Sequence, residues 1–119
     1  MRLVHWPGGR ERGDERVLAG HVETADSFLS RARGLMFRRS LPDDHVLAFR
    51  FDEPSDRLLH MLFVPFPIDA IWTVDGVVDH VARLRPWRGL GRGRADAIYE
   101  LPAGAAEGVY AGDEVRLTA

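Results

Sequence analysis

A two-residue loop near the middle of the chain constrains its fold more than any other feature. Asp75 and Gly76 separate two segments rich in β-branched and aromatic residues, 68–74 and 77–84. Asp-Gly is favoured in type I′ turns, because both central residues of such a turn need positive φ. We therefore predict an antiparallel hairpin over these two segments.

The loop also predicts which residues of the hairpin lie opposite one another. Trp72 falls on the face that carries most of the large apolar side chains, so we expect its indole to be buried. Asp69 and His80 fall on the other face. Counting outward from the loop, the predicted pairs are Val74 with Val77, Trp72 with Asp79, Ile71 with His80 and Asp69 with Ala82.

Short apolar segments between turn residues predict most of the remaining elements. Further strands are expected over 17–23, 46–51, 58–64, 98–101 and 114–118. One helix is expected over about 25–33, ended by Gly34, with a short second helix over about 105–110. The predicted class is a β-rich α+β fold of about seven short, mostly antiparallel strands in a partly closed barrel or sandwich.

Length and composition indicate a single domain over 1–119 and exclude several classes of protein. The 119 residues are 45% hydrophobic and 29% charged, as in globular proteins. The chain contains no cysteine, which excludes disulfides, thiolate metal sites and a cysteine nucleophile. No apolar segment is long enough to span a bilayer or resembles a signal peptide. We therefore expect a cytoplasmic protein with no membrane partner.

A glycine- and arginine-rich segment, 85–95, is the first candidate ligand site. We predict it to be a long, mobile loop, because three of its residues between 89 and 93 are glycine. Arginines can bind phosphate while an indole stacks on a base, although a solvated loop is the more common role. The net charge of −2 makes nucleic acid an unlikely partner. The candidate ligand-binding residues are Arg83, Arg85, Trp87, Arg88, Arg92 and Arg94.

Four polar side chains form an alternative candidate site: His60, Asp69, His80 and Glu100. Imidazole and carboxylate groups are the ligands that zinc prefers, so this set allows metal-assisted hydrolysis. Their spacing lacks a close ligand pair, and the more common role is structural. We expect Asp69 to accept hydrogen bonds from backbone amides or an arginine near the 65–67 turn, and a buried Glu100 to pair with arginine. No metal or other cofactor is predicted.

Three ordered motifs resemble one known family. They are 34–38 (GLMFR), His60-Met61 followed by 67–72 (PIDAIW), and 99–104 (YELPAG) followed by 112–115 (GDEV). Over about 17–117 they resemble the family called domain of unknown function 192, small bacterial and archaeal proteins. The resemblance implies a compact β-rich domain with no established activity. The chain departs from the pattern of this family at one place, where Leu62-Phe63-Val64 replaces the usual Lys-Asn-Thr.

These observations favour a non-enzymatic module that binds a small anionic ligand or a protein partner. A metal-assisted hydrolase is the alternative from a different functional class. Binding of single-stranded nucleic acid through the arginines of 83–94 is the second alternative.

Overall fold

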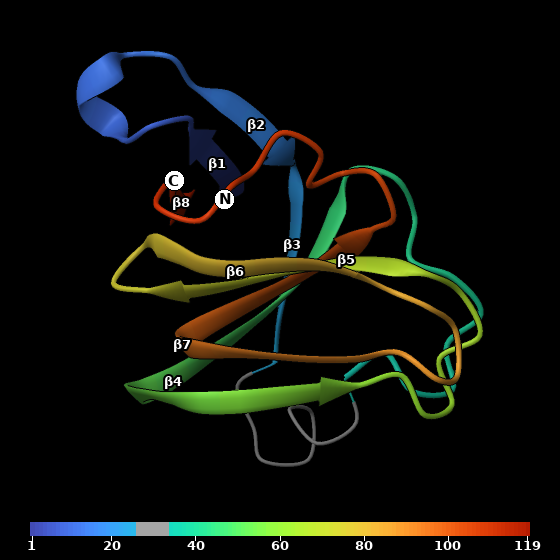
Figure 1. Cartoon of the computed structure of the whole chain (residues 1–119). Helices are drawn as coiled ribbons and strands as arrows, with labels where there is room; N and C mark the ends of the chain where they lie inside the picture. Colours follow the sequence, from blue (N-terminus) through green and yellow to red (C-terminus); the bar gives the residue numbers. More distant parts are fainter. Residues whose placement is uncertain (26–33) are drawn as a thin grey trace.

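The computed structural model describes residues 1–25 and 34–119, which form one mixed sheet of eight strands (Figure 1). The spatial order is β2-β1-β8-β6-β5-β7-β4-β3, so the sheet is open and β2 and β3 are its edges. Only the pair β3–β4 is parallel in the described part of the chain. The strands are β1 (Arg2–Trp6), β2 (Arg16–Ala19), β3 (His21–Ala25), β4 (His45–His60), β5 (Ile68–Val74), β6 (Val77–Leu84), β7 (Leu90–Pro102) and β8 (Glu114–Thr118).

The predicted hairpin is confirmed as β5 and β6, and Trp72 is fully buried. Its register is correct only next to the loop, where Val74 pairs with Val77. A β-bulge then shifts the pairing by one residue, so that Trp72 lies opposite His80 and Asp69 opposite Arg83. The predicted pairs of Trp72 with Asp79, Ile71 with His80 and Asp69 with Ala82 are therefore wrong. An extra residue in one strand of a bulge reverses the face of every side chain beyond it.

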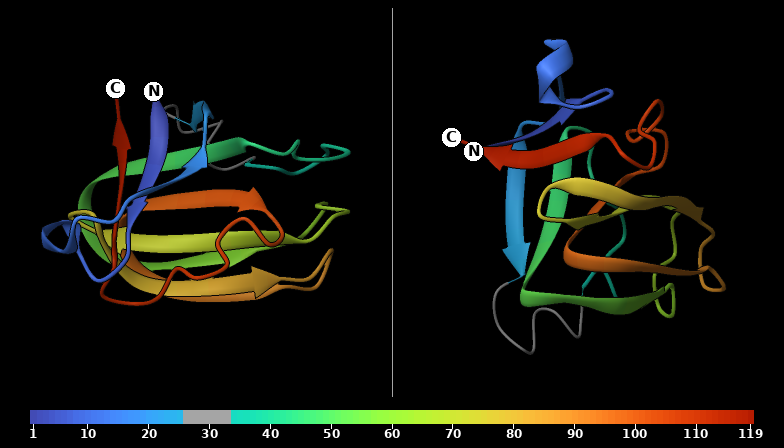
Figure 2. Two further views of the ribbon diagram at one scale, coloured as in Figure 1. Left: turned by 90° about the horizontal axis from the view of Figure 1, so that it is seen from above. Right: turned by 60° about the vertical axis from the view of Figure 1, so that its left-hand side comes forward.

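Two long strands, β4 and β7, let a single sheet cover two cores. Their first and second paired stretches are separated by an irregularity between Arg50 and Ser55, where the sheet bends. Figure 2 shows the resulting curvature and the neighbouring positions of the two termini on β1 and β8. One core lies around Ile71 and Val115, and the other lies around Trp72 and Ile98 on the opposite face of β5 and β7.

The α+β class predicted from the sequence is wrong, because the described residues contain no α-helix. A single 3-10 turn, Arg10–Arg12, is their only helical segment. The helix expected over about 25–33 falls, apart from Ala25 at the end of β3, outside the described residues. The predicted partly closed barrel or sandwich is also wrong, since the eight strands form one open mixed sheet with β2 and β3 at its edges.

The short helix expected over about 105–110 is replaced by consecutive turns. Gly104 and Gly108 have φ of 96° and 86°, in the left-handed region that ends a helix. The amides of Gly104 and Ala106 donate to the carboxylate of Asp69, at 2.9 and 3.0 Å. The carboxylate therefore orders these turns, and the positive φ of Gly108 prevents them from continuing as a helix.

Two strand assignments also change. The expected strand over 17–23 is divided at Gly20 into β2 and β3, because the amides of Gly20 and His21 both donate to the carbonyl oxygen of Asp44. The expected doubly buried strand over 58–64 is instead the exposed end of β4 and the loop after it, with Leu58 and Leu62 more than half exposed.

The predicted loop over 85–95 is largely part of β7, which begins at Leu90. Its glycines have a packing role rather than a flexible one. A Cβ at Gly91 would lie 2.6 Å from Cη2 of Trp72, and one at Gly93 would lie 2.6 Å from Cγ of the same indole. The ring fits against the strand only because these two residues lack side chains. Only the segment between Leu84 and Leu90 remains a connection.

A buried polar chain joins β1 to the turn before β8. His5 is fully buried, with Nε2 2.8 Å from a carboxylate oxygen of Asp113 and Nδ1 3.0 Å from a guanidinium nitrogen of Arg16. Because arginine can only donate, Nδ1 of His5 accepts from Arg16. Nε2 therefore carries the ring proton and donates a hydrogen bond to the carboxylate of Asp113. Burial would raise the pKa of Asp113, but hydrogen bonds from Gly8, Tyr110 and His5 outweigh it and lower that pKa.

In the part of the chain that the structure describes, no helix has the length and hydrophobicity needed to cross a membrane.

Candidate functional site

Three loops meet at the end of the sheet opposite the Asp75-Gly76 turn (Figure 1). They are 34–38, 61–67 and 85–89, and we call the surface they form the three-loop surface. Backbone hydrogen bonds connect them: the amide of Phe37 donates to the carbonyl of Phe63 at 2.8 Å, and that of Trp87 donates to Val64 at 3.0 Å. The three loops therefore form one hydrogen-bonded structure.

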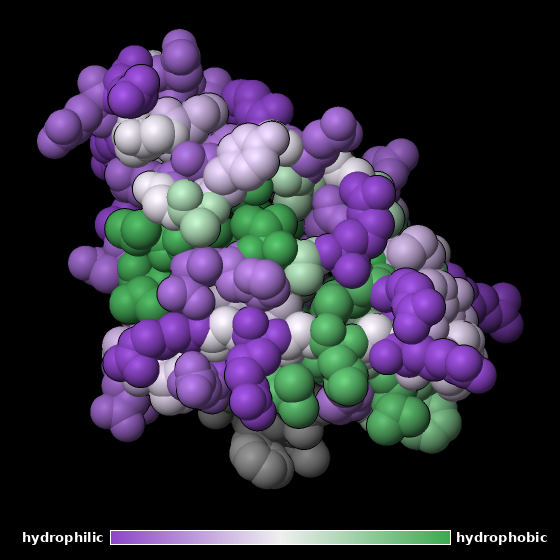
Figure 3. Space-filling model, viewed as in Figure 1, coloured by the Kyte–Doolittle hydropathy of each residue, from purple (hydrophilic) through white to green (hydrophobic). Residues whose placement is uncertain are grey.

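The first two loops place apolar side chains both in the core and in solvent, and the third exposes Trp87. Leu35, Met61 and Val64 are at most 3% exposed and anchor the first two loops. Their neighbours point outward: Phe37, Phe63 and Trp87 are 64%, 44% and 52% exposed. Figure 3 shows hydrophobic side chains beside hydrophilic ones at this end of the molecule, at the lower right of the view.

The three exposed aromatic rings contact one another in sequence. Phe37 and Phe63 are stacked with centroids 5.0 Å apart, and Phe63 meets Trp87 edge to face at 6.0 Å. All three residues have positive φ, at 68°, 60° and 66°. Bulky side chains are uncommon in this region, and such strain tends to gather at functional sites. An aromatic cluster built on three strained positions and left in solvent is the most unusual feature of the described structure.

Glycine is required at one position that supports this cluster. A Cβ at Gly89 would lie 2.7 Å from the backbone nitrogen of Arg85 and 2.8 Å from Cγ of Met61. The amide of Met61 donates to the carbonyl of Gly89 at 3.0 Å. The close approach of these two loops therefore depends on the absence of a side chain.

The three-loop surface is basic. Its loops contain Arg38, Arg85 and Arg88 and no acidic residue. Arg38 is paired with Glu23 of β3. Arg85 and Arg88 are exposed, and no ion pair joins either of them to a carboxylate within residues 1–25 and 34–119. Two guanidinium groups are thus left to attract an anionic group beside the aromatic rings.

Glu100 lies behind loop 34–38 but does not neutralise this charge. It is 5% exposed, and a Cβ at Gly34 would lie 3.6 Å from its Oε1. Burial raises the pKa of Glu100 to about 8, although the charge of Arg38 opposes the shift. The carboxyl group is therefore mostly protonated and neutral at pH 7, and the surface keeps its positive charge.

The six residues of the predicted arginine site are divided between different places. Arg85, Trp87 and Arg88 lie on the three-loop surface. Arg83 lies on β6, where its Nε donates to Asp69 at 2.9 Å. Arg92 and Arg94 are exposed on β7, opposite Leu58 and Asp56 of β4. The sequence placed all six in or beside one loop, whereas β7 draws the last two into the sheet.

The alternative polar site is not assembled. His60 ends β4, where its Nδ1 accepts from the amide of Leu62. His80 lies beside the ring of Trp72, at a centroid distance of 5.1 Å. Asp69 and Glu100 point to opposite faces, because Glu100 lies opposite Ala70 in the register. Among the described residues, no three histidine or acidic side chains are placed to hold a metal ion.

Asp69 has the contacts expected of a structural carboxylate. It is 4% exposed and accepts hydrogen bonds from Arg83 and from the amides of Gly104 and Ala106. These donors come from β6 and from the turns after β7, rather than from the 65–67 turn that the sequence suggested.

Sequence patterns do not indicate Phe37 and Phe63 as site residues, because Phe37 belongs to the 34–38 motif and Phe63 to the segment predicted to be a buried strand. The sequence gives no sign of their positive φ values, since phenylalanine does not favour the left-handed region. One signal was present: Leu62-Phe63-Val64 replaces the polar Lys-Asn-Thr that the resemblance implies at these positions.

Comparison with known proteins agrees with this fold and these motifs. The model of the DUF192 family, described as "Uncharacterized ACR", matches residues 10–117. The chain belongs to this family. A UPF0127 protein of Thermococcus sibiricus is 34% identical over 105 residues, which are 84% of this chain and 68% of that protein. A UPF0127 protein of Thermococcus gammatolerans is 36% identical over 75 residues, 61% of this chain. These 75 residues span about half of the archaeal protein, 48%.

A solved structure shares the same architecture. A protein of unknown function from Novosphingobium aromaticivorans superposes with a TM-score of 0.78 at 26% identity, covering 97% of this chain and 84% of that one. The names of these relatives state no activity. Family membership therefore establishes the fold and the motifs, and the three-loop surface must be interpreted from its own chemistry.

Proposed function

We propose that this DUF192 protein is a non-enzymatic interaction module that binds an acidic segment of a partner protein at the three-loop surface. The observation that carries the proposal is the cluster of Phe37, Phe63 and Trp87, exposed in strained conformations beside Arg85 and Arg88.

The apolar half of the argument concerns the rings. Exposed aromatic side chains supply large contact areas and lose little conformational entropy on binding. Phe37 and Trp87 are each more than half exposed, and Leu62, beside Phe63 in the chain, is 54% exposed. Clustered apolar exposure of this kind marks interaction surfaces. A partner that covers these rings removes apolar area from water, and this burial stabilises the complex.

The charged half concerns the arginines. A carboxylate of the partner can form a bidentate ion pair with a guanidinium group. Arg85 and Arg88 flank Trp87 in the chain, so a carboxylate beside an apolar side chain matches the arrangement of the surface. A segment that alternates acidic and apolar residues satisfies both features.

The arrangement supports a protein partner better than single-stranded nucleic acid or hydrolysis. Nucleic-acid grooves follow a phosphate backbone with a series of cations. Arg83, Arg92 and Arg94 lie on β6 and β7 rather than on the three-loop surface. Among the described residues, the loops of this surface therefore offer two arginines without an ion pair, Arg85 and Arg88. Metal-assisted hydrolysis has no ligand set among the described residues.

A chemical-shift titration tests the proposal. The probe is a short peptide that alternates glutamate with leucine and phenylalanine, and the control peptide carries glutamine in place of glutamate. We expect the amide resonances of Phe37, Phe63 and Trp87 and the indole resonance of Trp87 to move with the acidic peptide. No movement with either peptide, or movement only with an oligothymidylate probe and with a steep salt dependence, would contradict it.

A further inference from the structure

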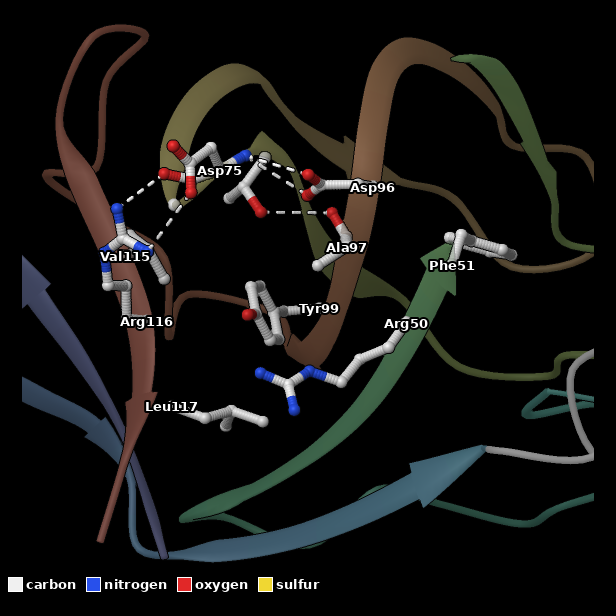
Figure 4. A pocket seen from close by; sticks show the side chains of 11 residues that line it. Arg50, Phe51, Asp75, Asp96, Ala97, Tyr99, Val115, Arg116 and Leu117 are labelled. Atoms are coloured by element: carbon white, nitrogen blue, oxygen red, sulfur yellow. Dashed lines mark hydrogen bonds and ion pairs between the residues drawn. The ribbon is translucent and has the colours of Figure 1, made fainter. Parts of the chain in front are cut away.

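A pocket lies next to the Asp75-Gly76 turn, at the end of the sheet opposite the three-loop surface (Figure 4). Its volume is about 330 Å³, and strands β4, β5, β7 and β8 all contribute to its walls. Pockets of this size accommodate small organic molecules. The polar side chains that line it are Arg50, Thr73, Asp75, Asp96, Tyr99 and Arg116.

Two arginines reach this pocket from strands that are far apart in the sheet order. Arg50 extends from β4 toward the ring of Tyr99, and Arg116 approaches from β8 on the other side (Figure 4). Both guanidinium groups act electrostatically on the Tyr99 hydroxyl, and both favour its anionic form. The charge of Asp96, which also lines the pocket, acts on the hydroxyl in the opposite direction.

Arg116 is held in place before any ligand arrives. Its Nε donates to Glu114 at 2.7 Å, and its Nη2 donates to the carbonyl of Asp75 at 2.6 Å. A Cβ at Gly76 would lie 2.3 Å from Cζ of Arg116. Glycine in the turn thus provides the space that the guanidinium group occupies. Preorganised donors bind an anion without losing further side-chain entropy.

Tyr99 supplies a neutral donor between the two arginines. The residue is 3% exposed, and burial raises the pKa of its hydroxyl despite the two guanidinium groups. The hydroxyl therefore stays protonated at neutral pH and can donate a hydrogen bond. Thr73 also lines the pocket, but its hydroxyl proton is donated to the carbonyl of Ala97 at 3.2 Å, so Tyr99 is the hydroxyl that faces a ligand as donor.

The acidic residues of the lining limit the charge of a ligand. Asp75 lies 3.7 Å from Nη1 of Arg116, and the carboxylate of Asp96 accepts from the amide of Asp75 at 3.1 and 3.2 Å. Two arginines and two aspartates give the lining a net charge of zero. A ligand with several negative charges would be repelled by the carboxylates, whereas one oxyanion group beside Arg50 and Tyr99 would not.

We propose that this pocket binds a small molecule through one oxyanion group, a carboxylate or a phosphoryl group, held between Arg50, Arg116 and the Tyr99 hydroxyl. The site is separate from the three-loop surface, at the opposite end of the sheet, and does not depend on the function proposed there.

The test is a chemical-shift titration with acetate and with inorganic phosphate, at low salt and up to roughly 10 mM. We expect the amide resonances of Thr73, Gly76 and Tyr99 to move with at least one probe, and the probe that binds identifies the head group. Arg50→Gln should weaken binding about tenfold or more. Arg92→Gln, a matched change on the exposed face of β7, should leave it unchanged.

Tyr99→Phe keeps the ring and removes only the hydroxyl. This variant should fold normally and bind the probe more weakly than the unmodified protein does. The proposal is overturned if neither probe moves these resonances. It is also overturned if Arg50→Gln and Arg92→Gln bind equally well.

Discussion

Phe37 and Phe63 are joined twice, through a 2.8 Å hydrogen bond between their backbones and through stacked rings 5.0 Å apart. Both residues have positive φ and both side chains are exposed. The hydrogen bond holds two loops together without requiring any particular side chain. The aromatic rings are thus not needed for the backbone geometry that they occupy, which is the arrangement expected when side chains are kept for binding.

The first prediction separates stability from binding at this pair. Phe37→Gly removes a 64% exposed ring and relieves a φ of 68°. Relief of strain offsets the greater flexibility of glycine in the unfolded chain, so the free energy of unfolding should change by less than about 1 kcal/mol. Binding of the acidic peptide should fall markedly. Urea unfolding and peptide titration of the same variant would check this, and a large loss of stability would show that the ring is structural.

The second prediction concerns the contact between Trp72 and the glycines of β7. Trp72→Ala should lower the free energy of unfolding by about 3–5 kcal/mol, because it empties a fully buried site. Gly93→Ala should lower it by about 1–3 kcal/mol through overpacking against the same indole. Gly20→Ala is the matched control, since the atoms nearest its new methyl group belong to the side chain of Asp44, which is 60% exposed and can move. Equal effects at Gly93 and Gly20 in urea unfolding would refute this account of β7.

The same contact explains why the sequence was misleading over 85–95. Glycine and arginine in alternation indicate a flexible, solvated loop when neighbours are unknown. Gly91 and Gly93 instead face a large ring from another strand, whereas Arg92 between them and Arg94 after them face solvent. Alternation of this kind is a strand pattern in which the inward residues are small. Only the identity of the facing side chain reveals it, and that contact is not local.

The hairpin was predictable because its signal is local. Asp75 and Gly76 determine the turn, and the pairs beside them follow. The bulge next to Trp72 was not predictable, because the carboxylate of Asp79 accepts a hydrogen bond from the amide of Arg94 on another strand, at 2.9 Å. That displacement moved His80 to the opposite face from Asp69, and the pairing of β5 with β7 separately places Glu100 on the other face from Asp69.

The third prediction tests the role of Asp69. Asp69→Ala should lower the free energy of unfolding by about 2–4 kcal/mol, because the amides of Gly104 and Ala106 lose their acceptor. Arg83→Gln should lower the free energy of unfolding much less, since the arginine side chain is 59% exposed and its ion pair is screened by solvent. Thermal or urea unfolding of both variants would measure the difference. If the arginine change were the more costly, the ion pair rather than the amides would explain the burial of this carboxylate.

The fourth prediction is a pH dependence caused by Glu100, whose pKa burial raises from 4.5 to about 8. Between these values the folded protein binds the proton more tightly than the unfolded chain. Stability therefore falls as the pH rises through this range, by about 1.4 kcal/mol for each pH unit. Below pH 4.5 the group is protonated in both states and has no effect on the pH dependence.

Glu100→Gln, which keeps the shape of the side chain and cannot ionise, should remove this loss. The difference in unfolding free energy between the variant and the unmodified protein should therefore increase from pH 5 to pH 8. Denaturant unfolding at several pH values measures it. A constant difference would mean that the carboxyl group is not neutral in the folded protein.

The three-loop surface was only partly predictable. Arg85, Trp87 and Arg88 were recognised as candidate binding residues because arginine beside an aromatic ring suits anionic partners. Phe37 and Phe63 lie 50 and 24 residues before Trp87 in the chain, and backbone hydrogen bonds between the loops bring them together. Their left-handed conformations oppose the local preference of phenylalanine, so no local pattern could indicate them.

The central claim, that Arg85 and Arg88 act with the aromatic cluster to bind an acidic segment, is tested most directly by two matched double variants. One carries Arg85→Gln and Arg88→Gln, and the other carries Arg92→Gln and Arg94→Gln on the exposed face of β7, so both lose the same net charge. Fluorescence anisotropy with the labelled acidic peptide should show binding weakened at least about tenfold in the first and nearly unchanged in the second. Equal weakening in both would mean that only overall charge attracts the peptide, and the three-loop surface would not be its binding site.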